Sequence, residues 1–435
     1  MFCGRDNELV EMNKRYEKDR FECIVIYGRR RIGKTALINT FCKDKPTVFF
    51  SALNASPYEN LEALSRAIYE HKNSDERLNY PTYRSYEDAL DEITKLSENE
   101  RMVLVIDEYP YLAKAEESIS SRLQHMIDHV WQNGKLYLIL CGSSMSFMEN
   151  QVLGYESPLY GRRTAQFRIQ PMDYREVQLF DENQTMEENA LVYGITGGVP
   201  HYINKLEMHG DIDKALLQNL FHSSSYLFEE PENLLKQELR EPAVYNSIIT
   251  AIANGASKSN EIASKVGIES GTCAKYLKVL LELGIIRKET PIAEKIGKKT
   301  IYLIEDNFFR FWYRFVPKNL SAINANRFER IYDRVVKEQL SDYMGLVFEK
   351  MCREYLLKYA EELPIILSEV GQWWGSDVSK KKEVQIDIIG TPVEGQEYII
   401  GSCKYKNKCV GIEELERLQE YAKVFGKGTK YYYYI

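Results

Sequence analysis

The stretch Gly28-Arg29-Arg30-Arg31-Ile32-Gly33-Lys34-Thr35 fits the pattern G-x-x-x-x-G-K-[ST] and decides the fold around it. The pattern describes a loop whose backbone N–H groups turn inward around a phosphate. Residues 21–27 form an apolar run typical of a buried strand, and residues 35–41 have the apolar spacing of a helix. A glycine loop between a strand and a helix N-terminus predicts an anion site.

We therefore expect ATP and Mg²⁺ as cofactors. Lys34 is expected to reach the β- and γ-phosphates, and the Thr35 hydroxyl is expected to bind Mg²⁺. The expected nucleotide contacts comprise the whole loop and the residue after it: Gly28, Arg29, Arg30, Arg31, Ile32, Gly33, Lys34, Thr35 and Ala36.

Composition narrows the class of protein. The 435 residues allow two to four domains, and 44% hydrophobic with 28% charged residues is typical of a globular protein with real cores. No apolar run approaches about 18 residues and no signal-peptide core follows the N-terminus, so we expect a cytoplasmic protein without a membrane partner. The eight cysteines include no C-x-x-C pair, which favours reduced thiols over a disulfide framework or zinc site. The net charge of −7 argues against a surface that is basic throughout.

Hydrolysis of ATP requires carboxylates that hold Mg²⁺ and activate water, and the end of a predicted strand supplies two. Residues 102–106 are apolar and are followed by Asp107 and Glu108. Asp107 is expected in the Mg²⁺ shell, and Glu108 is placed to polarise the attacking water. The alternative is a core strand that merely ends in acids. Residues 47–52 and 135–141 predict further strands of the same sheet, and Ser143 after the latter is either a γ-phosphate or water contact or a turn residue.

The run Phe2-Cys3-Gly4-Arg5-Asp6-Asn7-Glu8-Leu9 resembles the F-x-G-R-x-x-E-L box of AAA+ and STAND-type ATPases, where it lies against the adenine. Residues 159–163 and 197–200 are also similar to prokaryotic members of that group. The resemblance implies that Arg162 or Arg163 stabilises charge on the γ-phosphate, and that 198–200 is the hinge that closes a helical lid. The alternatives are surface arginines and a simple loop. The nucleotide contacts implied by the resemblance are Gly4, Arg5 and Pro200.

The resulting fold class is α/β: a P-loop parallel sheet with a helical lid, a winged helix-turn-helix, and a small α/β domain. The expected boundaries are 1–175 for the ATPase core, 176–240 for the lid, 241–306 for the winged helix, 307–337 for an aromatic, helical connector and 338–435 for the last domain.

In the winged helix, helical runs are expected from 242, near 259 and near 270, with wing strands at 285–289 and 300–304. Residues 240–305 hold ten Lys or Arg against seven Asp or Glu. If the domain binds DNA, the contacts would come from its third helix and its wing; otherwise it is a structural relay. The candidate DNA contacts are Thr272, Lys275, Lys278, Lys295, Lys298 and Lys299.

From Glu338 onward the chain resembles a C-terminal domain of prokaryotic ATPases that looks like a restriction-endonuclease-type core. In such nucleases an Asp and an acid two residues before a Lys bind Mg²⁺. Asp387 and Lys404 match, but Ser402 stands where the family usually has Glu. Glu349 or Glu369 is a candidate substitute. The loss of a carboxylate should weaken Mg²⁺ binding, so we expect a degenerate nuclease fold that serves binding or assembly, with Glu349, Asp387 and Lys404 as its remnant.

The leading hypothesis is an ATP-binding and ATP-hydrolysing molecular switch that acts on or near DNA through the winged helix and the C-terminal domain. One alternative is an Mg²⁺-dependent, ATP-regulated DNA nuclease. Another is a non-catalytic scaffold whose assembly ATP controls, as a homo-oligomer or with a protein partner. The strand-like run 430–435 at the end of the chain suggests a truncated chain or a partner that covers the strand.

Overall fold

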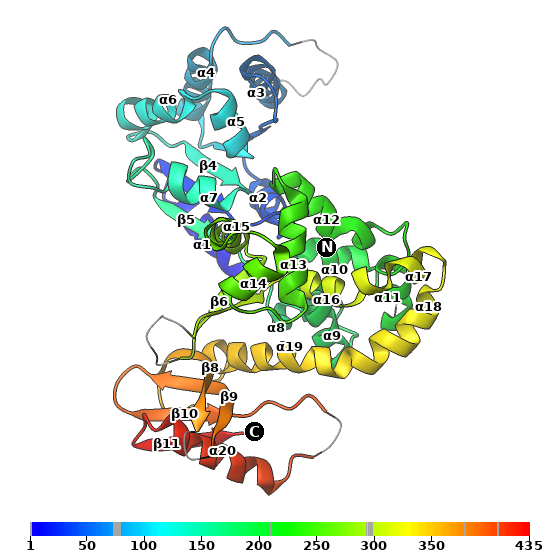
Figure 1. Ribbon diagram of the computed structural model, residues 1–435. Coiled ribbons are helices and arrows are strands. Elements are labelled where there is room, and N and C mark those ends of the chain that lie inside the picture. The colour runs from blue at the N-terminus through cyan, green and yellow to red at the C-terminus, as the bar shows by residue number, and fades with distance from the viewer. Residues whose placement is uncertain are drawn as a thin grey trace. The chain divides into compact units, whose positions relative to one another are not determined.

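The computed structural model of the protein describes residues 2–72, 80–208, 210–292, 294, 299–377, 380–406 and 409–435 (Figure 1). The chain divides into two compact units. The first comprises Met1–Met172 with Val199–His201, and the second comprises Asp173–Gly198 with Tyr202–Ile435. Within the described residues, no helix is long and apolar enough to cross a membrane.

Five strands of the described chain form one sheet in the first unit, in the order β2-β3-β4-β1-β5. Every neighbouring pair is parallel, which confirms the predicted parallel sheet. The sequence did not reveal β5, because it is only four residues long and half of it is exposed. The strands are β1 (Glu22–Tyr27), β2 (Thr47–Ser51), β3 (Val103–Asp107), β4 (Tyr137–Gly142) and β5 (Ala165–Arg168).

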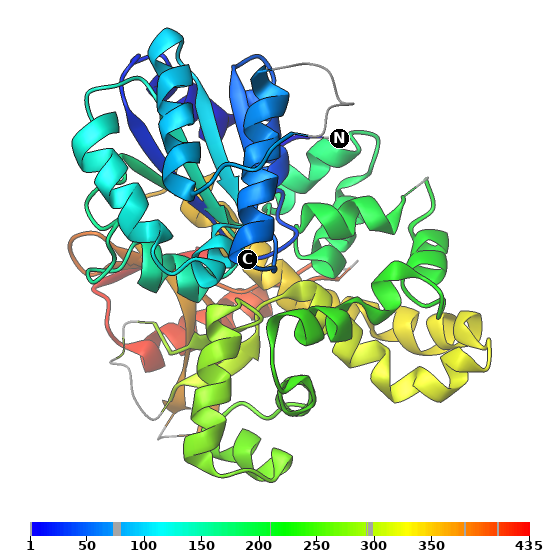
Figure 2. The same cartoon turned by 90° about the horizontal axis from the view of Figure 1, so that it is seen from above.

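Helices cover both faces of this sheet, as Figure 2 shows. Successive residues of a strand point to opposite faces. Accordingly Cys23 and Val25 of β1 belong to one apolar core, whereas Ile24 and Ile26 belong to the other. The helices of this unit are α1 (Asp6–Tyr16), α2 (Lys34–Cys42), α3 (Pro57–Lys72), α4 (Tyr86–Asn99), α5 (Tyr109–Ala115), α6 (Ile119–Met126) and α7 (Met145–Phe147).

The second unit begins with short helices in the region predicted to be a lid. They are α8 (Tyr174–Val177), α9 (Met186–Thr196), α10 (Pro200–Leu206), α11 (Ile212–Asn219) and α12 (Tyr226–Glu238). The expected three helices and two-stranded wing follow. They are α13 (Pro242–Ala253), α14 (Ser259–Val266), α15 (Ser270–Glu282), β6 (Ile286–Glu289) and β7 (Ile301–Ile304), and the two strands pair antiparallel.

The aromatic run after the wing forms α16 (Asn307–Phe315), whose aromatic side chains are buried. The Trp312 indole donates a hydrogen bond to the carbonyl of Phe228 in α12 at 2.7 Å. The Tyr343 hydroxyl donates to the carbonyl of Gly194 in α9 at 2.6 Å. These contacts make α16 part of a core shared by several elements of the second unit. The helices α17 (Leu320–Asn324), α18 (Phe328–Ile331) and α19 (Lys337–Lys358) follow.

The C-terminal part is a mixed sheet of four strands among the described residues, in the order β11-β10-β9-β8. The β8–β9 and β9–β10 pairs are antiparallel, and β10 and β11 are parallel. The helix between these parallel strands packs on the sheet. The elements are β8 (Leu367–Asp377), β9 (Lys382–Pro392), β10 (Glu397–Gly401), α20 (Ile412–Phe425) and β11 (Lys430–Tyr434).

Candidate functional site

The predicted phosphate loop joins β1 to α2, and its conformation requires glycine. Gly28 has φ 155° and Gly33 has φ 89°. A Cβ on Gly28 would lie 2.5 Å from both the carbonyl oxygen of Ile169 and Cδ1 of Ile32, so a larger residue would displace the loop. The loop is therefore held tightly against the segment that follows β5.

Lys34 opens α2 and is buried, with 7% of its surface exposed. Its Nζ donates hydrogen bonds to the carbonyl oxygens of Gly28 and Arg29, both at 2.9 Å. Burial lowers the pKa of this ammonium group, although Glu108 and Asp107 oppose the shift. A buried cation held by neutral carbonyls inside a loop of backbone N–H groups suits a phosphate.

Thr35 and Asp107 lie in contact at the ends of α2 and β3. The Thr35 hydroxyl donates to Asp107 Oδ2 at 2.9 Å, and the backbone N–H of Glu108 donates to Asp107 Oδ1 at 2.9 Å. A hydroxyl and a carboxylate side by side are oxygen ligands of the kind that Mg²⁺ takes beside a nucleotide phosphate. The two residues predicted to hold Mg²⁺ are thus brought together, and their donor chemistry fits the ion.

Glu108 has φ 52°, an uncommon conformation for a residue with a side chain. Strain of this kind concentrates at functional sites. The Ser143 hydroxyl donates to Glu108 Oε2 at 2.9 Å and to Oε1 at 3.2 Å. Ser143 reaches Glu108 because β4, whose end carries the serine, lies between β1 and β3 in the sheet.

The arginines of the loop and of 162–163 take separate positions. Arg30 Nη2 donates to the Tyr111 hydroxyl at 2.6 Å, and Arg31 has φ 72°. Arg162 forms a two-pronged pair with Asp128, with Nε to Oδ1 at 2.8 Å and Nη2 to Oδ2 at 2.7 Å. The hydrogen bond from Arg162 lowers the pKa of Asp128. Arg163 is half-buried in the segment before β5.

Arg5 is the buried arginine of the run Phe2–Leu9, and it links this run to the phosphate loop by hydrogen bonds. Its Nη2 donates to the carbonyl of Gln170 at 2.6 Å and to that of Ile32 at 3.3 Å. Gly4 before it has φ 67°. Pro200 also lies beside the loop, with Cγ 3.9 Å from the position that a Cβ on Gly33 would take. Residues remote in sequence therefore surround one loop.

In the C-terminal part, Asp387 of β9 and Lys404 after β10 lie together. Asp387 Oδ2 accepts hydrogen bonds from the Cys403 backbone N–H at 3.0 Å and from the Ser402 hydroxyl at 3.3 Å, and it lies 3.4 Å from Lys404 Nζ. Glu414 of α20 completes the cluster: it accepts a hydrogen bond from Ser402 and lies 3.3 Å from Lys404 Nζ.

The motif at 402–404 did not indicate Glu414. The signal was topological, because a parallel β10–α20–β11 crossover returns the start of α20 to the end of β10. We name Asp387, Ser402, Lys404 and Glu414 the β10 cluster.

Glu349 of α19 lies near the β10 cluster. The Gln372 side chain donates to Glu349 Oε2 at 2.6 Å. Burial, together with the Asp387 charge, raises the pKa of Glu349 to about 7. Within the described residues, however, no three His, Cys, Asp or Glu side chains are grouped so that they could hold a metal ion.

One face of the third helix of the winged helix is exposed, whereas described residues of the wing form ion pairs. Lys275 and Lys278 of α15 are exposed and Thr272 is half-buried. By contrast, Arg287 of β6 pairs with Glu305 at 2.6 Å, and Glu305 pairs with Lys350 of α19 at 2.6 Å. Of the candidate wing lysines, Lys299 pairs with Glu294 at 2.9 Å. Lys295 and Lys298 lie outside the described residues.

Three family descriptions match successive parts of the chain. Residues 2–206 match an ATPase domain found predominantly in Archaea, and residues 248–287 match a DNA-binding winged helix-turn-helix. Residues 312–418 match a family described as archaeal and bacterial proteins of unknown function.

A relative matches nearly the full length. The protein MJECL04 of Methanocaldococcus jannaschii is 32% identical over 444 residues, which cover 98% of this chain and 96% of that protein. The ATP-binding protein MJ0423 of the same organism is 40% identical over 45 residues, or 10% of this chain and 76% of that protein.

Among solved structures, the Walker-type ATPase PABY2304 of Pyrococcus abyssi shares the fold. It has a TM-score of 0.56 at 20% identity and covers 72% of this chain and 96% of its own. Together with the parallel P-loop sheet, the winged helix and the mixed C-terminal sheet, these likenesses establish the family. The chain belongs with MJECL04 to a family of archaeal-type ATPases in which an ATPase domain is followed by a winged helix-turn-helix and a restriction-endonuclease-like domain.

Proposed function

We propose that the protein is a molecular switch that binds ATP with Mg²⁺, hydrolyses it, and passes the nucleotide state to the winged helix and the C-terminal domain. The observation that carries the proposal is the meeting of Thr35, Asp107, Glu108 and Ser143 beside the phosphate loop. A phosphate-binding loop alone accounts for binding, whereas the acidic strand end beside it accounts for hydrolysis.

Each residue has a role that follows from its position. Lys34 would exchange its carbonyl partners for phosphate oxygens, and Thr35 with Asp107 would hold Mg²⁺, whose charge would stabilise the transferring phosphate. Glu108 would orient the attacking water and accept its proton. Ser143 would position the Glu108 carboxylate. We assign a supporting role to Arg5, which anchors the loop, and propose Arg162 or Arg163 as the arginine that reaches the γ-phosphate.

Val199–His201 supports the coupling step. These three residues belong to the first unit, whereas the segments before and after them belong to the second. The His201 N–H donates to the carbonyl of Arg31 in the phosphate loop at 3.4 Å, and Pro200 lies beside Gly33. A change in the loop upon nucleotide binding would therefore act on the point where the chain enters the second unit.

Phosphate release and hydrogen exchange test the switch together. We expect the protein to release phosphate from ATP with Mg²⁺ and to stop when EDTA removes the ion. Hydrogen exchange of residues 202–240 should differ between the ATP-analogue and ADP states. Bound ATP without phosphate release would favour the assembly scaffold, and identical exchange in both states would contradict the coupling. Light scattering in each state would report the assembly.

We propose that α15 contacts DNA phosphates through its exposed lysines. We expect Lys275→Glu with Lys278→Glu to weaken duplex binding at least about tenfold and to lower the salt slope of log K by about 2, since each phosphate contact contributes about 1. Fluorescence anisotropy of a labelled duplex across a salt series measures both. The matched control is Lys258→Glu, just before the neighbouring helix α14, with Lys265→Glu on that helix. Unchanged affinity in the α15 variant would leave the winged helix as a structural relay.

Glu414 favours a second candidate function, an Mg²⁺-dependent nuclease. Its carboxylate lies at the position of the β10 cluster where Ser402 left an acid missing. This candidate predicts plasmid nicking with Mg²⁺ that falls at least about 100-fold in Asp387→Ala and in Glu414→Gln. Glu413→Gln, an exposed neighbour on the same helix, should retain nicking. Plasmid that stays intact with and without ATP would contradict the nuclease and leave the domain a binding or assembly role.

A further inference from the structure

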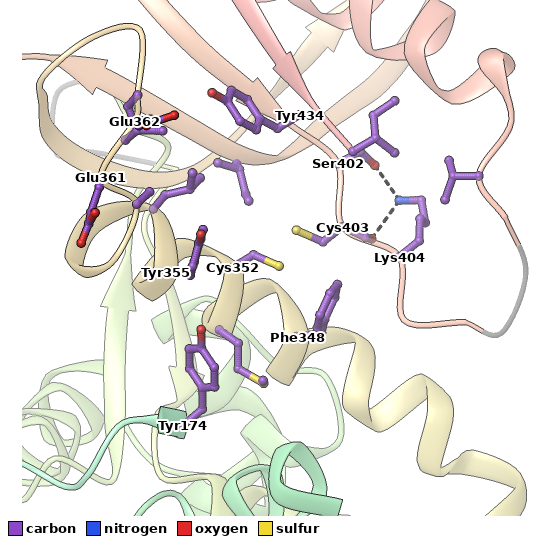
Figure 3. A pocket seen from close by; sticks show the side chains of 17 residues that line it. Tyr174, Phe348, Cys352, Tyr355, Glu361, Glu362, Ser402, Cys403, Lys404 and Tyr434 are labelled. Carbon is purple, nitrogen blue, oxygen red and sulfur yellow. Dashed lines mark hydrogen bonds between the residues drawn. The ribbon is translucent and has the colours of Figure 1, made fainter. Parts of the chain in front are cut away.

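A cavity of about 580 Å³ in the C-terminal part of the second unit brings two thiols together (Figure 3). Cys352 extends from α19, and Cys403 follows the end of β10. Both line the cavity, and their side chains point toward each other. Residues far apart in the sequence thus bring two thiols to one cavity.

The cavity gives small reagents access to this pair. Both thiols are partly exposed, unlike those of Cys23 and Cys141, which are buried in strands of the first unit. The volume lies in the range of sites that admit small molecules. Thiol exchange requires such access as well as proximity. The pair therefore satisfies two conditions that the buried strand cysteines do not.

The elements that carry the thiols also carry the β10 cluster and its neighbour. Cys352 lies one helical turn after Glu349 on α19. Cys403 stands between Ser402 and Lys404, and its backbone N–H donates to Asp387 at 3.0 Å. A covalent link between the two sulfurs would consequently fix the turn that positions Ser402 and Lys404 relative to α19.

We propose that Cys352 and Cys403 are a redox-sensitive pair that forms a reversible disulfide by exchange with a small-molecule disulfide such as oxidised glutathione. One thiolate attacks the reagent, a mixed disulfide forms, and one glutathione leaves as a thiol. The second protein thiolate then attacks the mixed disulfide and releases the other glutathione. Two S–H bonds of the protein are replaced by one S–S bond, and the reagent's S–S bond is reduced to two thiols.

Disulfide formation between Cys352 and Cys403 requires neither ATP hydrolysis nor nuclease activity. Both cysteines are free thiols in this structure, and an S–S bond is about 2.05 Å long, so closure needs a movement of α19 or of the turn after β10. Disulfides in reducing compartments are usually transient and redox-sensing. Partial exposure, a shared cavity and a place beside a charged cluster fit such a role.

Mass spectrometry of the full chain tests the proposal. The protein is incubated with oxidised glutathione, denatured, alkylated and digested. We expect two of its eight thiols to escape alkylation, with Cys352 and Cys403 in one linked peptide, and dithiothreitol to restore both. Cys352→Ser and Cys403→Ser should each retain glutathione on the remaining partner. Cys409→Ser, the matched control with an exposed cysteine, should still form the linkage.

Two results would overturn the proposal. One is a wild-type protein whose eight thiols all remain alkylatable or carry only glutathione adducts. The other is a linked peptide that joins Cys403 to Cys409 or to a cysteine other than Cys352. Because both readouts come from the wild-type chain, they decide the matter even if a serine variant folds poorly.

Discussion

Lys34→Ala is expected to lose ATP binding, with the dissociation constant raised at least about 100-fold. Two hydrogen bonds from an ammonium group to phosphate are worth about 1.5–3 kcal/mol each, and 1.4 kcal/mol corresponds to a factor of ten. Because Lys34 is buried, water cannot easily replace the hydrogen bonds that the ammonium group makes, and the loss of affinity should be larger than at an exposed site. Isothermal titration calorimetry with ATP and Mg²⁺ measures the affinity directly.

The control for this variant lies on the same stretch of chain. Lys43 follows α2 and is exposed, so Lys43→Ala removes the same charge away from the loop and should bind ATP as the wild type does. Thermal unfolding of both variants checks the fold, since Lys34→Ala leaves the Gly28 and Arg29 carbonyls without their Nζ donor. A folded Lys34→Ala protein with affinity within about threefold of the wild type would contradict the assigned phosphate site.

Glu108→Gln is expected to bind ATP normally and to hydrolyse it about 10²–10³-fold more slowly. Glutamine keeps the size of the side chain and can accept the Ser143 hydrogen bond, but it cannot take a proton from the attacking water. The expected signature is therefore a fall in kcat with little change in the dissociation constant. Single-turnover phosphate release, beside calorimetry on the same sample, separates the two quantities.

Two further variants define what the Glu108 result means. Ser143→Ala removes the hydroxyl that contacts the carboxylate, and it should reduce kcat less than Glu108→Gln because the proton acceptor remains. Glu117→Gln changes an exposed acid after α5 and should leave turnover unaltered. If Glu108→Gln turns over ATP as fast as the wild type, Glu108 is not the base, and Asp107 becomes the candidate for that role.

Much of the fold could be predicted because its signals are local. The glycine loop, the apolar run before it and the helical spacing after it identified β1 and α2 to within one residue at each end. The three helices and two strands of the winged helix are similarly marked by period and by glycines at helix ends. The weak strand β5 was missed, since four half-exposed residues carry little periodicity.

In the C-terminal part, sequence spacing revealed some residues of the β10 cluster but not all of them. The spacing of Asp387 and Lys404 was visible in the sequence, and so was the missing acid at Ser402. Glu414 was not visible as the companion of Lys404, because it stands ten positions later and only the crossover through α20 brings it back. The meeting of Cys352 and Cys403 in one cavity was hidden for the same reason.

The sequence by itself determined which candidate functional groups the protein has: a phosphate loop, an acidic strand end, lysines on a third helix and an incomplete nuclease motif. Tertiary structure alone decided which of these groups meet. The insertion of β4 between β1 and β3 sets Ser143 against Glu108, and Arg162 is engaged by Asp128. Backbone periodicity is a short-range property that a sequence records directly, whereas contacts between distant side chains depend on strand order and helix packing.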